Sequence, residues 1–334
     1  MSLKFNLFRP FFECPRCAEL NLKISELEKQ ADELGRQNQE LQKKLNAIQA
    51  ANAAMTPLQP VVPIAAMSPE SGWAHLKASV VGHKKASLQD AHRLLTEGES
   101  AVLVVCDGAG SKKHSKAGAD FIAGFLADRF RDLMAQDGGV SADNWPELSR
   151  SLFHEATKGL KDKAKAEVKS YDDYGCTCIV VYAGKDFVAC AHVGDGRAGY
   201  LDPSGHWKAL MTPYKGALAN ATVFMTMLEV HNADTLMETQ VVKVRTRAVV
   251  ALSDGPEEVC WQVSAFNQTG QQVIDPNQPS NDYLSKIANQ LAAKAAKAVS
   301  QADLDTQWQK FLTDGSPKLA AQVDDKTLLL ALRG

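Results

Sequence analysis

The chain has 334 residues, of which 45% are hydrophobic and 23% are charged. These proportions are typical of a globular protein and exclude wholesale disorder. The 37 Lys and Arg residues nearly balance the 39 Asp and Glu residues, so no overall basic field indicates nucleic-acid binding. The odd number of cysteines, seven, does not suggest a secreted disulfide framework. We find no signal peptide and no apolar run of roughly 20 residues, and therefore expect a cytoplasmic protein without a transmembrane segment.

Residues 1–17 form an N-terminal segment that contains the pair Cys14 and Cys17. Two cysteines separated by two residues can supply half of a tetrahedral zinc site. A parallel dimer would bring two such pairs together, so a shared zinc site is one hypothesis for this segment. An unliganded reduced pair and an occasional disulfide are the alternatives.

Residues 18–50 carry apolar side chains with a seven-residue period, which predicts a coiled coil. Asn38 stands in the apolar row, where a single polar residue commonly fixes the register of a parallel dimer. We expect a homo-oligomer, most simply a parallel dimer. A single amphipathic helix lying on its own domain is the alternative. The residues assigned to the contact are Leu20, Ile24, Leu27, Leu34, Asn38, Leu41 and Leu45.

Residues 51–72 contain four prolines, at positions 57, 60, 63 and 69. Proline removes a helical hydrogen bond and clashes with the preceding turn, so the helix cannot continue through this segment. We expect an extended linker of proline and alanine. Residues 73–334 then form a single large domain.

Within this domain, strand and helix patterns come in blocks. In chain order, we expect a strand at 101–106, helices at 115–136 and 145–168, strands at 176–182, 187–193, 197–201, 241–244 and 248–252, a helix at 283–299, and a strand at 327–332. Strands come in runs and helices in pairs, without strict alternation. This pattern favours an α+β architecture with sheets packed inside and helices outside.

Four aspartates stand at the ends of expected strands. Asp107 and Asp254 each follow a strand, Asp324 precedes one, and Asp90 precedes the short segment 92–95. Taken singly, an Asp-Gly after a strand is typical of an ordinary turn. Carboxylates gathered at one end of a sheet, however, need a compensating cation. Oxygen ligands without His or Cys suit Mg²⁺ or Mn²⁺ better than zinc.

Five segments, taken together, resemble the metal-dependent protein phosphatase family, the type 2C serine/threonine phosphatases, and most closely its bacterial branch. In the family's order they are SLQDAH (87–92), VVCDGAGSKKHSKAGAD (104–120), GCTCIVVYAGKDFVACAHVGDGRAGYL (175–201), VVALSDGPEEV (249–259) and DDKTLLLAL (324–332). The resemblance extends over roughly residues 73–334. It implies a four-layer α-β-β-α sandwich, in which helices flank two antiparallel sheets.

The resemblance also implies roles for the aspartates. Asp107 would bridge two metal ions, and the carbonyl of Gly108 would help to hold one of them. Asp254 and Asp324 would complete the other ion. Asp90 would hold metal-bound water or act as a ligand at the same centre.

Three further positions belong to the implied site. Asp195 would lie nearby and could assist a third ion. Gln89 stands where many relatives have Glu, and its amide oxygen could ligate a metal without contributing charge. Lys85 stands where eukaryotic relatives place an arginine that grips the phosphate. A lysine can hold phosphate as a point charge, but not through two parallel hydrogen bonds.

These features predict a hydrolase, a signalling phosphatase that uses two or three Mg²⁺ or Mn²⁺ ions. It would remove phosphate from serine or threonine of a phosphoprotein through a metal-activated water, and oppose a cognate Ser/Thr kinase. Asp90, Asp107 and Lys85 are the predicted catalytic residues. Two alternatives stay open. One is a pseudo-phosphatase that binds a phosphoprotein or kinase without turnover, because Gln89 and Lys85 depart from the family pattern. The other is a phosphatase-fold regulator whose substrate is a small phosphorylated molecule.

Overall fold

The computed structural model describes residues 72–136, 138–214, 222–228, 233–266 and 273–334, together with Lys23 and Ile64. The chain divides into two units, Met1–Pro57 and Leu58–Gly334, and all elements described below belong to the second. The predicted coiled coil, with every contact residue assigned to it, and the Cys14–Cys17 zinc site lie outside the described residues. They stay predictions.

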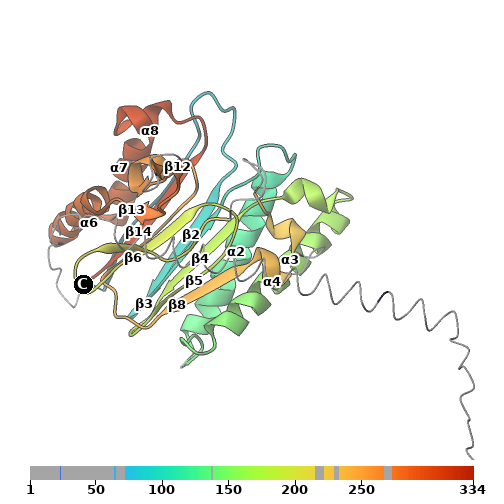
Figure 1. Cartoon of the computed structure of the whole chain (residues 1–334), viewed down its shortest axis with the longest axis horizontal. Coiled ribbons are helices and arrows are strands. Elements are labelled where there is room, and N and C mark those ends of the chain that lie inside the picture. Colours follow the sequence, from blue (N-terminus) through green and yellow to red (C-terminus); the bar gives the residue numbers. More distant parts are fainter. Residues whose placement is uncertain are drawn as a thin grey trace, which may run out of the picture. The chain divides into compact units, whose positions relative to one another are not determined.

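Two five-stranded sheets form the centre of the second unit, and every strand pair is antiparallel (Figure 1). The first sheet has the order β1-β14-β9-β6-β7 and the second the order β2-β3-β4-β5-β8. The strands of the first sheet are β1 (Trp73–Val80), β6 (Arg197–Leu201), β7 (Trp207–Ala209), β9 (Ala248–Leu252) and β14 (Lys326–Arg333). Those of the second are β2 (Ala91–Glu97), β3 (Ser100–Cys106), β4 (Cys178–Ala183), β5 (Val188–Val193) and β8 (Glu238–Val242).

Helices cover the outer face of each sheet (Figure 1). The pair α2 (Ser115–Met134) and α3 (Trp145–Ala166) packs on the second sheet, and the pair α6 (Asn281–Ala296) and α7 (Gln301–Asp314) packs on the first. The short elements are η2 (Tyr171–Tyr174), η3 (Met225–Met227), α4 (Ala233–Leu236), α5 (Glu257–Cys260), α8 (Pro317–Ala321) and the small strands β10 (Trp261–Gln262), β11 (Ala265–Phe266), β12 (Val273–Ile274) and β13 (Gln278–Pro279).

Three apolar layers hold these four layers of secondary structure together. One lies between the second sheet and α2–α3, one between the two sheets, and one between the first sheet and α6–α7. Strand β3 shows how the sequence encodes this: Val102 and Val104 face the helices, whereas Leu103 and Val105 face the other sheet. A strand covered on both faces is apolar throughout. The predicted α-β-β-α sandwich is confirmed.

Several element boundaries differ from the expected ones. The helix expected at 283–299 ends at Ala296, and Ala298 has a positive φ of 53°. The strand expected at 176–182 begins at Cys178, because Cys176 pairs only through an isolated bridge to Gly108. The strand expected at 241–244 begins earlier, at Glu238. Strand β1 and helices α7 and α8 were not predicted.

Ile64 lies in the predicted linker but packs into the apolar layer between the first sheet and α6–α7. It is buried, and its carbonyl accepts a hydrogen bond from the guanidinium of Arg247 at 3.2 Å. At this residue, therefore, the chain already contributes to the core of the domain.

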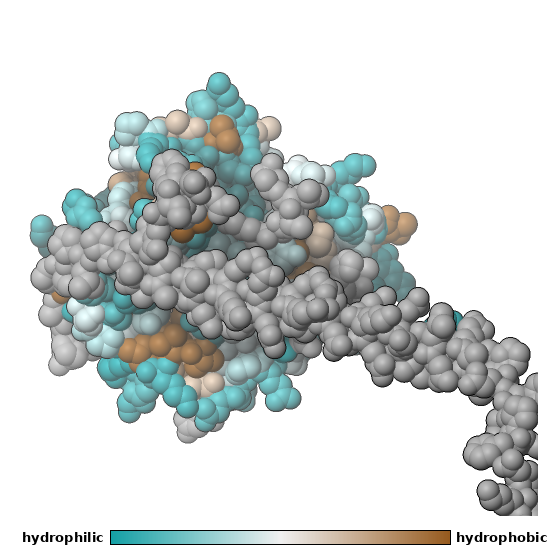
Figure 2. Space-filling model, viewed as in Figure 1, coloured by the Kyte–Doolittle hydropathy of each residue, from teal (hydrophilic) through white to brown (hydrophobic). Residues whose placement is uncertain are grey.

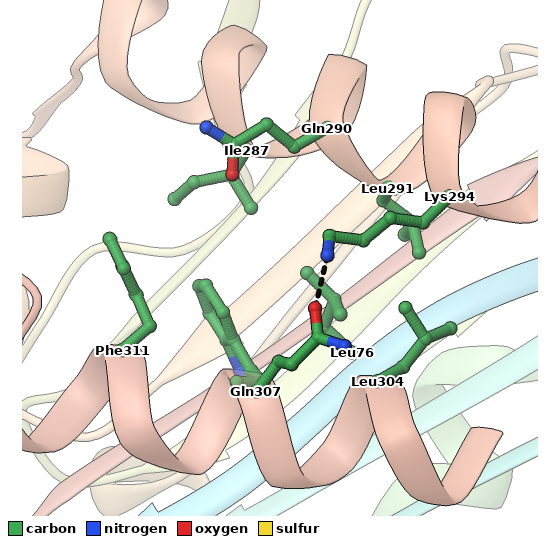
Figure 3. A pocket seen from close by; sticks show the side chains of 9 residues that line it. Leu76, Ile287, Gln290, Leu291, Lys294, Leu304, Gln307 and Phe311 are labelled. Atoms are coloured by element: carbon green, nitrogen blue, oxygen red, sulfur yellow. Dashed lines mark hydrogen bonds between the residues drawn. The ribbon is translucent and has the colours of Figure 1, made fainter. Parts of the chain in front are cut away.

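A groove separates α6 from α7 (Figure 3). Apolar side chains of both helices, with Leu76 of β1, line it, and the ammonium of Lys294 donates a hydrogen bond across it to the side-chain oxygen of Gln307. Its lining contains none of the predicted metal ligands. The groove therefore belongs to the helix packing and not to the predicted site.

The surface that the structure describes is mainly hydrophilic, with hydrophobic residues confined to small patches on the face seen in Figure 2. Among the described residues, the exposed large hydrophobic side chains are Val81, Val168, Val273 and Val323. No helix in this part of the chain combines the length and the apolar character needed to cross a membrane.

Candidate metal centre

Strand register places Asp90 beside Asp107. Strands β2 and β3 pair so that Ala91 lies opposite Cys106. Asp90 directly precedes the first of these residues and Asp107 directly follows the second. The two aspartates therefore meet at one end of the second sheet.

The first sheet delivers the other two aspartates in the same way. In the antiparallel pair of β9 and β14, Leu252 at the end of β9 lies opposite Leu328, near the start of β14. One residue separates Asp254 from the end of β9, and one residue separates Asp324 from the start of β14. Asp107, Asp254 and Asp324 then line a single cleft of about 670 Å³ of empty space, together with Asp195 from the turn between β5 and β6.

Asp90 is 1% exposed and stands behind the cleft. Its Oδ2 accepts hydrogen bonds from the hydroxyls of Ser253, at 2.8 Å, and Thr327, at 2.7 Å. Its Oδ1 is buried and accepts no hydrogen bond from an N–H or hydroxyl group, as is true of Oδ1 of Asp254; both carboxyl groups lie against that of Asp107. One oxygen of each of these carboxylates is thus left for a further ligand.

Burial and mutual repulsion disfavour the charged forms of these carboxyl groups. Burial raises the pKa of Asp90 to about 6, against the opposing hydrogen bonds from Thr327 and Ser253. Burial, followed by the charges of Asp324 and Asp195, raises the pKa of Asp254 to about 7. Burial and the charge of Asp90 hold the pKa of Asp107 well above its usual range.

The donor set fits a hard divalent cation. The Oδ1 atoms of Asp90 and Asp254 could coordinate such a cation, whose charge would relieve the repulsion that raises these pKa values. In the described ranges, no three His, Cys, Asp or Glu side chains are arranged as a group that could hold a metal ion as they stand.

Lys85 also reaches the cleft, where its ammonium pairs with the carboxylate of Asp324 and lies 3.7 Å from Oδ2 of Asp325. Burial alone would lower the pKa of Lys85. The hydrogen bond to Asp324 and the nearby acidic charges outweigh this effect together, so the pKa is raised above its usual value. The lysine therefore carries a positive charge beside a predicted metal ligand.

Gln89 forms hydrogen bonds both to the start of helix α2 and to the segment that precedes β14. Its side-chain amide donates to the hydroxyl of Ser115 at 2.9 Å, and its backbone N–H donates to Oδ2 of Asp325 at 2.7 Å. Oδ1 of Asp325 accepts from the backbone N–H of Gly82 at 2.8 Å. Asp325 thus fastens the segment that carries Lys85 and Gln89 to the start of β14.

Two glycines of the motifs are required because backbone passes close to backbone. A Cβ on Gly255 would lie 2.0 Å from the carbonyl oxygen of Asp325, and one on Gly108 would lie 2.6 Å from that of Gln89. These contacts exclude any side chain. Glycine therefore brings the segments of Asp254 and Asp107 close to the rest of the site.

Four polar residues behind Asp90 were not predicted: Ser79, His92, Ser253 and Thr327. His92, Ser253 and Thr327 lie within segments that carry the family resemblance, but only the aspartates of those segments were singled out. Ser79 lies in the unpredicted strand β1. Burial and the charges of Arg93, Lys77 and Lys116 lower the pKa of His92 to about 4, so the ring is neutral near pH 7.

The family profile described as Protein phosphatase 2C matches residues 82–308, more than half of the chain. The chain belongs to the protein phosphatase 2C family. The matched range contains Lys85, Gln89, Asp90, Asp107, Asp195 and Asp254. Membership identifies the protein as a protein phosphatase, and it makes phosphorylated proteins the expected class of substrate.

Solved structures show the same fold. Two arginine variants of a bacterial serine phosphatase are each 17% identical, with TM-scores of 0.51 and 0.50; each alignment covers 80% of this chain and 99% of the other. The serine/threonine phosphatase Stp1 from Staphylococcus aureus is 14% identical with a TM-score of 0.48, covering 83% of this chain and 99% of that one. No curated protein sequence matched the chain.

Proposed function

We propose that this protein phosphatase 2C member is an active, Mg²⁺- or Mn²⁺-dependent phosphatase of phosphoserine and phosphothreonine in proteins. One observation carries the proposal. The buried Oδ1 atoms of Asp90 and Asp254 accept no hydrogen bond from an N–H or hydroxyl group, beside a cleft that Asp107, Asp254 and Asp324 line. Unpaired buried oxygens of this kind are costly unless a ligand completes them.

Asp90, Asp107, Asp254 and Asp324 would hold two ions, with the carbonyl of Gly108 and the side chain of Gln89 as further donors and Asp195 near a third position. When bound, the ions lower the pKa of a water that attacks phosphorus and neutralise charge on the phosphoryl oxygens.

The chain holds these donors rigidly. The backbone of Asp107 is fixed on both sides by Thr177, whose hydroxyl accepts from its N–H at 3.1 Å and whose N–H donates to its carbonyl at 2.8 Å. Two hydroxyl donors fix the rotamer of Asp90. Such preorganisation removes reorganisation cost at the moment of reaction. Lys85 places a positive charge at the edge of the same cleft, where it could also meet a phosphoryl oxygen.

The experiment is phosphate release from a phosphoserine or phosphothreonine peptide by the purified full chain, with Mn²⁺ and with EDTA. We expect metal-dependent turnover that Asp107→Asn lowers by about 100-fold or more, because this change removes a carboxylate charge from the proposed metal site. Asp128→Asn is the matched control, since Asp128 is 72% exposed and pairs with Arg131 on the surface of α2.

Wild-type protein that releases no phosphate, or an Asp107→Asn variant as active as wild type, would contradict the proposal. Phosphopeptide binding without turnover would instead support the pseudo-phosphatase alternative. Faster turnover of a small phosphate ester than of the peptide would support a small-molecule substrate. The coiled-coil dimer, the cognate kinase, the signalling role and the cytoplasmic location stay predictions.

A further inference from the structure

A chain of hydrogen bonds runs from Asp90 into the space between the two sheets. The hydroxyl of Thr327 contacts Oδ2 of Asp90 at 2.7 Å. The hydroxyl of Ser79 contacts that of Thr327 at 2.5 Å, and Nδ1 of His92 contacts the hydroxyl of Ser79 at 2.7 Å. Ser79 and Thr327 are register partners on β1 and β14. His92 lies on β2, so the last bond joins the first sheet to the second.

The direction of every bond in this chain follows from its two ends. As a metal ligand, Asp90 is a carboxylate and can only accept. Thr327 therefore donates its hydroxyl proton to Asp90, and Ser79 donates to Thr327. The oxygen of Ser79 is then left to accept, so Nδ1 of His92 must carry the proton.

A second path confirms that the hydroxyls are fully used. The backbone N–H of Thr327 donates to the hydroxyl oxygen of Ser253 at 3.1 Å. Ser253 in turn donates its proton to Oδ2 of Asp90 at 2.8 Å. Both donors reach the same oxygen of Asp90, which leaves Oδ1 without an N–H or hydroxyl donor. The network thus distinguishes the two oxygens of one carboxylate.

We propose that His92 and Ser79 are positioning residues which, through Thr327, hold the Asp90 carboxylate with Oδ1 presented to the metal ion. The proposal rests on the proposed function for the role of Asp90. His92 acts as its Nδ1–H tautomer and contacts neither metal nor substrate. Partners behind a metal ligand orient it and raise its basicity, and their loss typically lowers metal affinity or activity by about 10–100-fold.

The first test determines the tautomer of His92 in wild-type protein. Two-bond ¹H–¹⁵N correlation spectra of the imidazole distinguish a protonated Nδ1 from a protonated Nε2. We expect Nδ1–H, with and without the diamagnetic ion Mg²⁺. An Nε2–H tautomer would reverse the last bond and overturn the proposal.

The second test measures Mn²⁺ affinity by calorimetry, without turnover. Thr327→Val keeps the shape and removes the hydroxyl, so we expect affinity to fall by about 10–100-fold. Ser79→Ala and His92→Leu break the chain further from Asp90, and we expect each to lower affinity roughly 3–10-fold. Thr327→Ser and His92→Asn restore a donor at the same position and should recover most of the loss.

The matched control is Ser285→Ala. Ser285 is fully buried on α6, where its hydroxyl accepts from the indole N–H of Trp207 at 3.2 Å, so the same atoms are removed elsewhere in the core. If Ser79→Ala binds Mn²⁺ as wild type does, or loses no more affinity than Ser285→Ala, the proposal is wrong. Wild-type protein that binds Mn²⁺ but hydrolyses nothing would contradict only the proposed function.

Discussion

At the scale of single residues, Lys85 supplies a positive charge that partly offsets the negative charge of the acidic cleft when no metal is bound. Its ammonium pairs with Asp324, which is also a predicted metal ligand, so lysine and metal ion compete for the same carboxylate. The family resemblance also predicts that this lysine takes the place of the arginine with which eukaryotic relatives grip the phosphate. It can therefore oppose metal binding and favour substrate binding at once.

Lys85→Met separates these two effects. We expect Mn²⁺ to bind about 3–10-fold more tightly, because Asp324 loses a competing cation. We also expect the KM for a phosphopeptide to rise by a similar factor, because a positive charge beside the phosphate is lost. Calorimetry measures the first quantity and steady-state kinetics the second. Unchanged values of both would show that Lys85 has neither role.

The sequence predicted the aspartates but not the residues that orient them. Asp107 and Asp254 stand out because each opens an Asp-Gly after an apolar strand. Ser79 carries no such signal, since a serine in a mixed strand has many ordinary roles. Its importance arises from the register that places it opposite Thr327, and the packing that brings β2 within reach of it. Contacts between residues so far apart in the chain cannot be predicted from the local spacing of residue types.

At the scale of elements, Arg197 connects strand β6 to the segment that follows Asp254. Its guanidinium is fully buried and donates to Glu257 at 2.9 Å, Asp275 at 2.7 Å and Asn277 at 2.8 Å. Glu257 opens α5, and its backbone N–H donates to the carbonyl of Asp254 at 3.0 Å. A single arginine of β6 therefore holds Glu257, Asp275 and Asn277 against the first sheet, and Glu257 is close in sequence to the predicted metal ligand Asp254.

Arg197→Met should destabilise the protein by about 3–5 kcal/mol, because Glu257, Asp275 and Asn277 lose three hydrogen bonds from one fully buried guanidinium. The free energy of unfolding in urea measures this. Arg245→Met is the matched control: Arg245 pairs with Glu99 at 2.9 Å on the surface, where side-chain exposures are 51% and 48%. Such pairs contribute about 0–1 kcal/mol. Equal losses in the two variants would refute the assigned role of Arg197.

Sequence patterns predict best those strands that are buried on both faces, because nearly all their residues are apolar. Strand β3 is buried on both faces and reads as a continuous apolar run. Strand β1 was not predicted because it lies at a sheet edge and mixes Leu76 and Val80 with polar residues. Helix α7 does carry Leu304, Trp308 and Leu312 at helical spacing and a capping Ser300. This spacing and the serine cap are the local signals that predict such a helix.

At the scale of the whole molecule, the acidic cleft works against folding when no metal is bound. The folded-state pKa of Asp254 is raised from 3.8 to about 7. Between these values the folded protein binds more protons than the unfolded chain, so stability falls as pH rises through this range. Below pH 6.5 the lowered pKa values of His75 and His92 act in the opposite direction. The effect of the carboxyl groups is therefore clearest above pH 6.5.

In EDTA, the free energy of unfolding should decrease by about 1 kcal/mol between pH 6.5 and 8, as Asp254 loses its proton. Urea titrations at several pH values measure this. Asp254→Asn should flatten the dependence, since the amide does not titrate. Excess Mg²⁺ at pH 8 should restore stability, because a ligand that binds only the folded state stabilises it. A stability that rises with pH in EDTA over this window would count against the assignment.

The order of the strands also has a consequence for synthesis of the protein. Strand β14 is the last element described, yet it lies inside the first sheet between β1 and β9, and Asp324 and Thr327 come with it. A ribosome-bound chain that has not yet released these residues has neither a finished sheet nor a complete ligand set. We therefore expect that the proposed metal site forms only after this strand has emerged and inserted.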